Sequence, residues 1–107
     1  MKSLSDREKG FEAEFKRNQE LMFRVTARRN RLFGLWAAAQ LGLPLGEEAE
    51  AYAKTVVAAD FEAPGDGDII EKVRTDLEQK GIAATETALR TELERAAAEA
   101  RRQLAQS

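Results

Sequence analysis

An apolar pattern with helical spacing runs from position 11 to position 43, and it constrains the fold more than any other feature of this sequence. Alternate steps of four and three residues give a seam that only two polar residues interrupt: Phe11, Phe15, Asn18, Met22, Val25, Arg29, Leu32, Trp36, Ala39 and Leu43. This spacing predicts one long helix, which begins at the capping-box pair Ser5 and Glu8 and ends near Gly42. At about 1.5 Å per residue such a helix is roughly 55 Å long. That length exceeds what a single small domain covers, so we expect part of the helix to project.

Three further segments have helical spacing. The first runs from about Glu47 to Glu62 and is terminated by Pro64 and Gly65. A short one is capped by Asp66 and stopped by Gly81, and the last follows Thr85. Because no segment shows the alternation of a strand, the sequence predicts an all-α fold, a four-helix bundle with a long first helix.

A boundary is expected near Asn18 and Gln19. Residues 1–18 offer few apolar side chains, and a helix of about 15 residues is marginal alone in water. We therefore interpret residues 1–18 as an N-terminal arm, a mobile or frayed helix when free, and residues 19–107 as the bundle. The stripe expected to be buried in that bundle on the first helix comprises Leu21, Met22, Val25, Leu32, Phe33, Trp36 and Ala39.

The composition excludes several kinds of chemistry. The chain has no cysteine and no histidine, so it has no thiolate nucleophile, no imidazole relay and no metal site built on those ligands. The acidic turn at residues 64–68 departs from the calcium-loop pattern, and no phosphate-binding glycine loop is present. No apolar run approaches the ~20 residues that a membrane span needs. We expect a cytoplasmic protein with no enzymatic activity, no metal and no transmembrane segment.

Positive charge is concentrated toward the N-terminus. Residues 1–31 contain nine Lys and Arg against five Asp and Glu, and the strongest basic patch lies between Arg24 and Arg31. This patch leaves open a nucleic-acid-binding module or a helical adaptor for an acidic partner. A sequence pI of about 5.3 disfavours nucleic acid.

Two charged residues occupy positions where the helical pattern calls for apolar ones. Arg29 lies in the seam of the first helix, and Asp60 lies inside the stripe of the second. A carboxylate near a helix C-terminus is disfavoured by the helix dipole, so a neighbouring cation would compensate it. The sequence therefore predicts an Arg29–Asp60 ion pair that fixes the register of these two helices.

The arm has the pattern of a helix that binds in a groove. Phe11 and Phe15 lie one turn apart among alternating charges, an arrangement in which aromatic anchors enter a pocket and flanking charges set the orientation. The simpler alternative is that both phenylalanines extend the core of the bundle.

Three stretches resemble a known family. They are residues 6–15, residues 27–38 with the run Ala27-Arg28-Arg29-Asn30-Arg31-Leu32, and residues 52–66, which span Tyr52-Ala53 to Pro64-Gly65-Asp66. In these stretches the chain resembles the ζ subunits of alphaproteobacterial F-type ATP synthases. The resemblance covers most of the sequence.

The resemblance implies a regulatory inhibitor of F1-ATPase that is peripheral on the membrane-bound ATP synthase. Its arm would insert into a catalytic interface of the α and β subunits, against the γ shaft, and block ATP hydrolysis. By this likeness Phe11 and Phe15 are expected to be the anchors, and the orienting charges are expected to be Arg7, Glu8, Lys9, Glu12 and Lys16. The free chain is expected to be a monomer with no required cofactor, and the resemblance adds weak binding of ATP or ADP, for which the sequence shows no phosphate loop.

Overall fold

The computed structural model describes residues 4–60 and 65–106, and it describes side chains from Lys16 onward within those ranges. Four helices follow one another along the chain: α1 (Leu4–Gln40), α2 (Glu47–Ala59), α3 (Gly67–Gln79) and α4 (Glu86–Gln106). All regular structure in the described residues is helical, which confirms the predicted all-α class.

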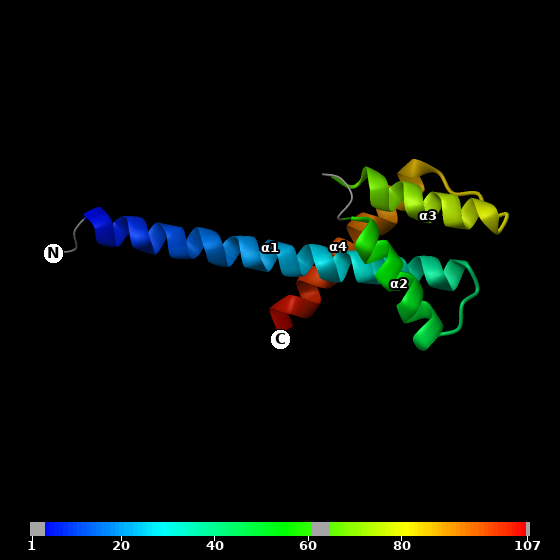
Figure 1. Cartoon of the computed structure of the whole chain (residues 1–107), viewed down its shortest axis with the longest axis horizontal. Coiled ribbons are helices and arrows are strands. Elements are labelled where there is room, and N and C mark those ends of the chain that lie inside the picture. The colour runs from blue at the N-terminus through cyan, green and yellow to red at the C-terminus, as the bar shows by residue number, and fades with distance from the viewer. Residues whose placement is uncertain (1–3, 61–64, 107) are drawn as a thin grey trace.

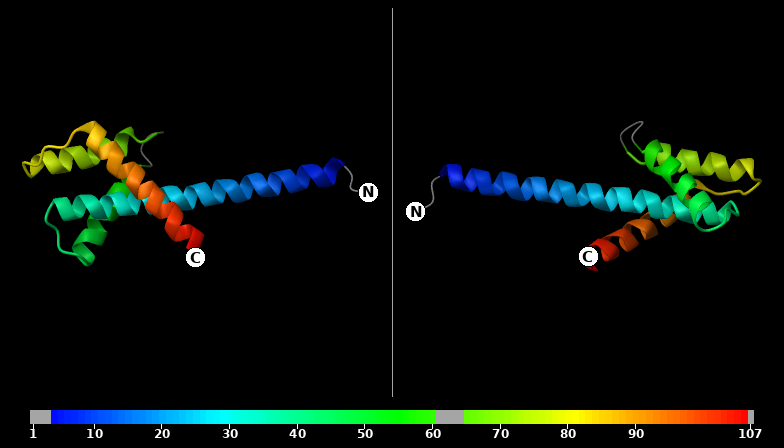
Figure 2. Two further views of the ribbon diagram at one scale, coloured as in Figure 1. Left: turned by 180° about the vertical axis from the view of Figure 1, so that it is seen from behind. Right: turned by 60° about the horizontal axis from the view of Figure 1, so that its bottom comes forward.

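Helix α1 is much longer than the other three, and they cluster around its C-terminal half (Figures 1 and 2). Its N-terminal half extends away from them, which gives the molecule an elongated shape of 66 × 26 × 20 Å. The projection that the length of the predicted helix required is therefore present.

Helices α1 and α3 end in the same way. After α1, the N–H of Leu43 donates to the carbonyl of Ala38 at 2.9 Å, and Gly42 has a φ of 78°. After α3, the N–H of Ile82 donates to the carbonyl of Leu77 at 2.9 Å, and Gly81 has a φ of 75°. These bonds and left-handed glycines form Schellman motifs, which satisfy the last carbonyls of both helices.

The helix starts agree less uniformly with the sequence. Thr85 caps α4, since its Oγ1 accepts a hydrogen bond from the N–H of Ala88 at 3.1 Å. Asp66 precedes α3 as expected but makes no capping hydrogen bond, because its carboxylate is bound to Arg29. Helix α2 ends at Ala59, three residues before the predicted end at Glu62, which lies outside the described residues.

The core lies between the C-terminal half of α1 and the other helices. Its α1 side is Phe33, Ala37 and Ala38, and the larger side chains opposite are Val56, Ile69, Ile70, Val73, Leu77, Leu89 and Leu93. At Gly34, α2 approaches so closely that an added Cβ would lie 2.8 Å from the Cα of Ala53. Small residues on α1 therefore let the two helix backbones nearly touch.

The predicted buried stripe of α1 is only partly correct. Phe33 is buried, and Val25, Leu32 and Trp36 are partly buried, but Leu21, Met22 and Ala39 are exposed. The most buried line runs one position later, through Asn30, Phe33, Ala37 and Ala38. Its phase follows the small residues because they permit the closest packing against α2.

Candidate partner-binding surface

The projecting half of α1 carries the residues that the sequence assigned to partner binding. Lys16 is exposed, as is every residue from there to Arg24. The other six predicted contact residues have side chains outside the described part of the structure, although their backbone belongs to α1: Arg7, Glu8, Lys9, Phe11, Glu12 and Phe15.

Three consecutive large apolar residues of α1 lie where the helix leaves the bundle. We call Leu21, Met22 and Phe23 the collar. These side chains are 52%, 68% and 63% exposed, which is unusual for three large apolar residues in succession. Two hollows flank the collar. One of about 210 Å³ lies toward the end of α2, beside Val57 and Asp60. The other, of about 270 Å³, lies toward the end of α4, beside Arg101.

A chain of polar contacts joins α1 to both ends of the α2–α3 connection. Arg29 Nη2 lies 2.9 Å from Asp66 Oδ1, and Arg29 Nε donates to Asn30 Oδ1 at 2.9 Å. Asn30 Nδ2 in turn donates to Asp60 Oδ2 at 2.9 Å. The predicted Arg29–Asp60 ion pair is therefore wrong. Arg29 pairs with the acid that follows the connection, and the buried Asn30 binds the one that precedes it.

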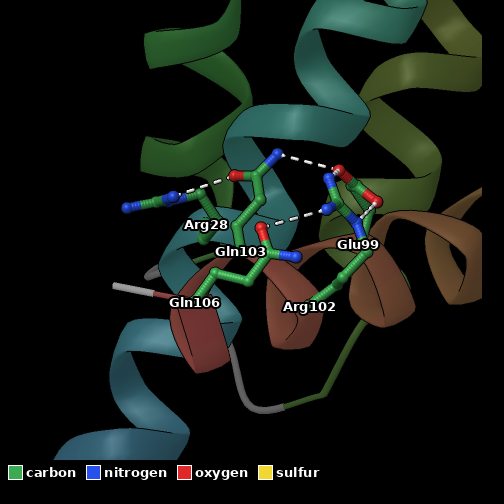
Figure 3. A network of polar contacts seen from close by, with 5 residues as sticks. All are labelled: Arg28, Glu99, Arg102, Gln103 and Gln106. Carbon is green, nitrogen blue, oxygen red and sulfur yellow. Dashed lines mark hydrogen bonds and ion pairs between the residues drawn. The ribbon is translucent and has the colours of Figure 1, made fainter.

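A second polar network fastens the end of α4 to α1 (Figure 3). Arg28 Nη1 donates to Gln103 Oε1 at 2.8 Å, and Gln103 Nε2 donates to Glu99 Oε1 at 3.1 Å. Glu99 also pairs with Arg102, which donates to Gln106 at 3.2 Å. The hydrogen bonds from Arg102 and then Gln103 lower the pKa of the Glu99 carboxyl to about 2, so the network stays charged over the physiological range.

These contacts disperse the basic patch of the sequence. Arg28 is bound to α4, Arg29 to Asp66, and Arg31 to Glu50 of α2. Arginines bound to α4, to Asp66 ahead of α3 and to α2 do not form one surface for a phosphate backbone. The structure thus gives no support to the nucleic-acid alternative.

A sequence model of the family described as ATPase inhibitor subunit zeta matches residues 1–103. The chain belongs to this family.

A solved structure supports the fold of this zeta-family chain. It is a solution NMR structure of a protein that is 44% identical, with a TM-score of 0.71 over 80% of this chain and 96% of the other. Among curated proteins, none matches the zeta-family chain significantly.

A third polar cluster of the zeta-family chain was missed from the sequence. Tyr52 Oη donates to Asp76 Oδ2 at 2.8 Å, and Lys72 Nζ donates to the same oxygen at 2.8 Å. Lys72 also lies 5.4 Å from the centre of the Tyr52 ring. Burial and, next, the hydrogen bond to Asp76 raise the pKa of the Tyr52 phenol. The cluster joins α2 to α3.

Two of the missed features have a signal in the sequence of this zeta-family member. Asn30 shares the spacing of Phe33, Ala37 and Ala38, so its side chain lies on the buried face although the residue belongs to the basic run. The collar is a run of three large apolar residues, which cannot all face one neighbouring helix. The Tyr52 cluster has no such signal, because its acid lies on another helix.

No group of three or more acidic side chains in the described ranges is arranged to hold a metal ion. Within residues 4–60 and 65–106, no helix combines the length and the apolar character of a membrane span.

Proposed function

We propose that this chain is a regulatory, non-catalytic subunit that inhibits ATP hydrolysis by the F1 sector of ATP synthase. In this proposal the N-terminal part of α1 enters a catalytic interface between the α and β subunits, against γ. The observation that carries the proposal is the projection of α1 beyond the helices that it packs against (Figure 1). A helix that leaves its own bundle is available to a groove on a partner.

The mechanism we propose is steric and thermodynamic. A helix wedged between subunits that move during hydrolysis stabilises one rotary state, and turnover requires that state to be left. The extent of inhibition then depends on how much more tightly the helix binds that rotary state than the others.

The contact residues stay those that the family likeness suggests. Phe11 and Phe15 would anchor the helix, and the orienting charges would be Arg7, Glu8, Lys9, Glu12 and Lys16. The residues from 19 onward would carry this arm and raise its effective concentration at the groove once docked. The free chain would be monomeric and would associate with the membrane only through the ATP synthase.

The proposal requires no cofactor. Weak binding of ATP or ADP remains an expectation from the family likeness, and equilibrium dialysis of the free chain against each nucleotide would test it. The proposed inhibition does not depend on the result.

The deciding experiment measures ATP hydrolysis by cognate purified F1. The full chain is added in one series and a chain lacking residues 1–18 in another, after circular dichroism has shown that both are folded. The truncation removes none of the residues that are buried in the described structure. The bundle is therefore expected to fold without residues 1–18. Inhibition by the full chain alone supports the arm as the effector.

Two anchor variants and one control variant refine the test. Phe11→Ala and Phe15→Ala remove the proposed anchors. As the control, Leu45→Ala removes an apolar residue that is 92% exposed in the loop between α1 and α2. Each anchor variant should weaken inhibition by about tenfold or more. Equal potency of the anchor variants and Leu45→Ala would contradict the proposed contact.

A further inference from the structure

The collar poses a packing problem that α1 does not solve within this chain. Successive residues of an α-helix point about 100° apart, so Leu21, Met22 and Phe23 together cover roughly 200° of its circumference. Helices α2 and α4 reach this part of α1 only with their ends, where the two hollows lie. An apolar band over more than half of the helix requires a partner that surrounds it.

The charges around the collar indicate what that partner's surface is like. Lys16, Arg17, Arg24 and Arg101 are exposed and form no ion pair with any side chain that the structure describes. Among the exposed side chains from Lys16 to Arg24 the only acid is Glu20, and Asp60 lies beside one hollow with a hydrogen bond from the neutral amide of Asn30. The four cations therefore outnumber the two acids near the collar. The collar is therefore an apolar band with a positive border.

We propose that the collar is seated in an apolar socket with an acidic rim on the F1 surface, next to the groove that receives residues 1–18. This inference rests on the proposed function and extends it. Binding would then continue past the arm to the point where α1 enters the bundle. The collar would supply affinity, and the arm would supply inhibition.

A second copy of this chain fits the collar less well. In a twofold contact the same surface meets itself, so the positive borders of both collars would lie close together. Uncompensated like charges beside an apolar contact oppose such a dimer. An acidic rim on a different protein neutralises the same charges.

The test uses the full-length double variant Met22→Gln with Phe23→Gln. Glutamine is a good helix former, and both side chains are mostly exposed, so α1 and the fold should be retained. Leu45→Gln is the matched control, because it also makes an exposed apolar side chain polar, far from the collar. Circular dichroism and a thermal melt establish that all three chains are folded.

Binding to cognate F1 is measured by fluorescence anisotropy, and residual ATP hydrolysis is measured at saturating chain. The double variant should bind about 30-fold more weakly, the loss typical of removing an interfacial hot spot. At saturation it should still inhibit as fully as the unmodified chain, because residues 1–18 are intact. The control should match the unmodified chain in both measurements. Arg24→Gln with Arg101→Gln should reduce the salt dependence of binding.

The outcomes separate the two proposals. Full inhibition with an unchanged Kd in the double variant overturns the collar and leaves the proposed function standing. If the unmodified chain binds F1 tightly without inhibiting it, and the double variant loses this binding, the result supports the collar and contradicts the inhibitory arm. If sedimentation shows that the double variant loses only self-association, the collar is a contact between copies and the inference is wrong.

Discussion

Asn30 is the one polar residue among the buried side chains of the described structure, and it lies on the line that packs against α2. A buried amide is tolerated only when its hydrogen bonds are satisfied. Asn30 meets this condition by accepting from Arg29 and donating to Asp60. It thereby links a partly buried cation on α1 to the acid at the end of α2.

Replacement of Asn30 by alanine should lower the free energy of unfolding by about 2 kcal/mol, because the carboxylate of Asp60 and the Nε of Arg29 lose their partner. The matched change is Arg31→Ala, which breaks an exposed ion pair with Glu50 and should cost at most about 1 kcal/mol. Urea denaturation followed by circular dichroism measures both. Equal losses in the two variants would show that the Asn30 contacts are not special.

The Tyr52 phenol is expected to make the stability of the fold depend on pH in the alkaline range. Its pKa is raised in the folded chain, so the stability that its hydrogen bond to Asp76 contributes is complete below the ordinary tyrosine pKa of about 10. That stability is lost as the pH rises toward the raised value, because the unfolded chain ionises first. Urea denaturation from about pH 8 to about pH 11 tests this.

In that titration, Tyr52→Phe should be about 1 kcal/mol less stable than the unmodified chain at the lower pH, since it lacks one hydrogen bond. The difference should shrink as the pH rises, because phenylalanine does not ionise. Lys72 and Asp76 are retained in both chains, so the comparison isolates the change at residue 52. A constant difference across the range would contradict the assigned cause.

The sequence predicted that Arg29 is paired, but not its partner. Asp60 and Asp66 lie on either side of one short connection, and the residue pattern contains nothing about the path of that connection. The carboxylate of Asp66 was expected to cap α3, and the structure uses it for Arg29 instead. Long-range polar pairs depend on tertiary geometry, which periodicity does not contain.

At the scale of the helices, boundaries followed from local chemistry. Gly42, Gly81 and Thr85 stop or cap a helix through contacts with residues close to them in the sequence. The ends of α1 and α3 and the start of α4 were therefore predictable. The phase of α1 was not. Residues 32–39 of its C-terminal half contain no polar side chain, so spacing alone could not identify the face that meets α2.

The close contact between α1 and α2 makes Gly34 sensitive to substitution. In Gly34→Ala the added Cβ would lie 2.8 Å from backbone Cα of Ala53 and 3.2 Å from Cβ of Val56, so the helices must separate. We expect a loss of about 1–3 kcal/mol in unfolding free energy, although alanine favours helix.

Gly67→Ala provides the control for this change, because Gly67 begins α3 and an added Cβ there meets nothing. It should be neutral or slightly stabilising. Thermal denaturation of both variants, monitored by circular dichroism, compares them directly. A Gly34→Ala chain as stable as Gly67→Ala would mean that α1 and α2 separate without cost.

At the scale of the whole molecule, the elongated shape predicts a gradient of stability along α1. Side chains from Lys16 to Arg24 are exposed, whereas those from Asn30 to Ala38 are buried or partly buried except for Arg31. Helical turns without tertiary contacts open readily. Amide hydrogen exchange should therefore slow by at least about 100-fold between Glu20 and Phe33.

This gradient also tests the predicted boundary near Asn18 and Gln19, which stays a prediction. Protection that falls steadily from Phe33 toward Lys16 would place the boundary in the projecting half. Uniform protection through this half in the free monomer would contradict an arm that is mobile when free.

Because α1 is continuous, the bundle also fixes the rotational orientation of the projecting half about the helix axis. Because one helix spans Leu4–Gln40, the packing of its C-terminal half against α2 sets the direction in which the described side chains from Lys16 to Arg24 point. One alanine inserted after Gln19 would turn the preceding part by about 100° and shift it by only about 1.5 Å. The bundle thus sets the orientation of the projecting helix as well as carrying it.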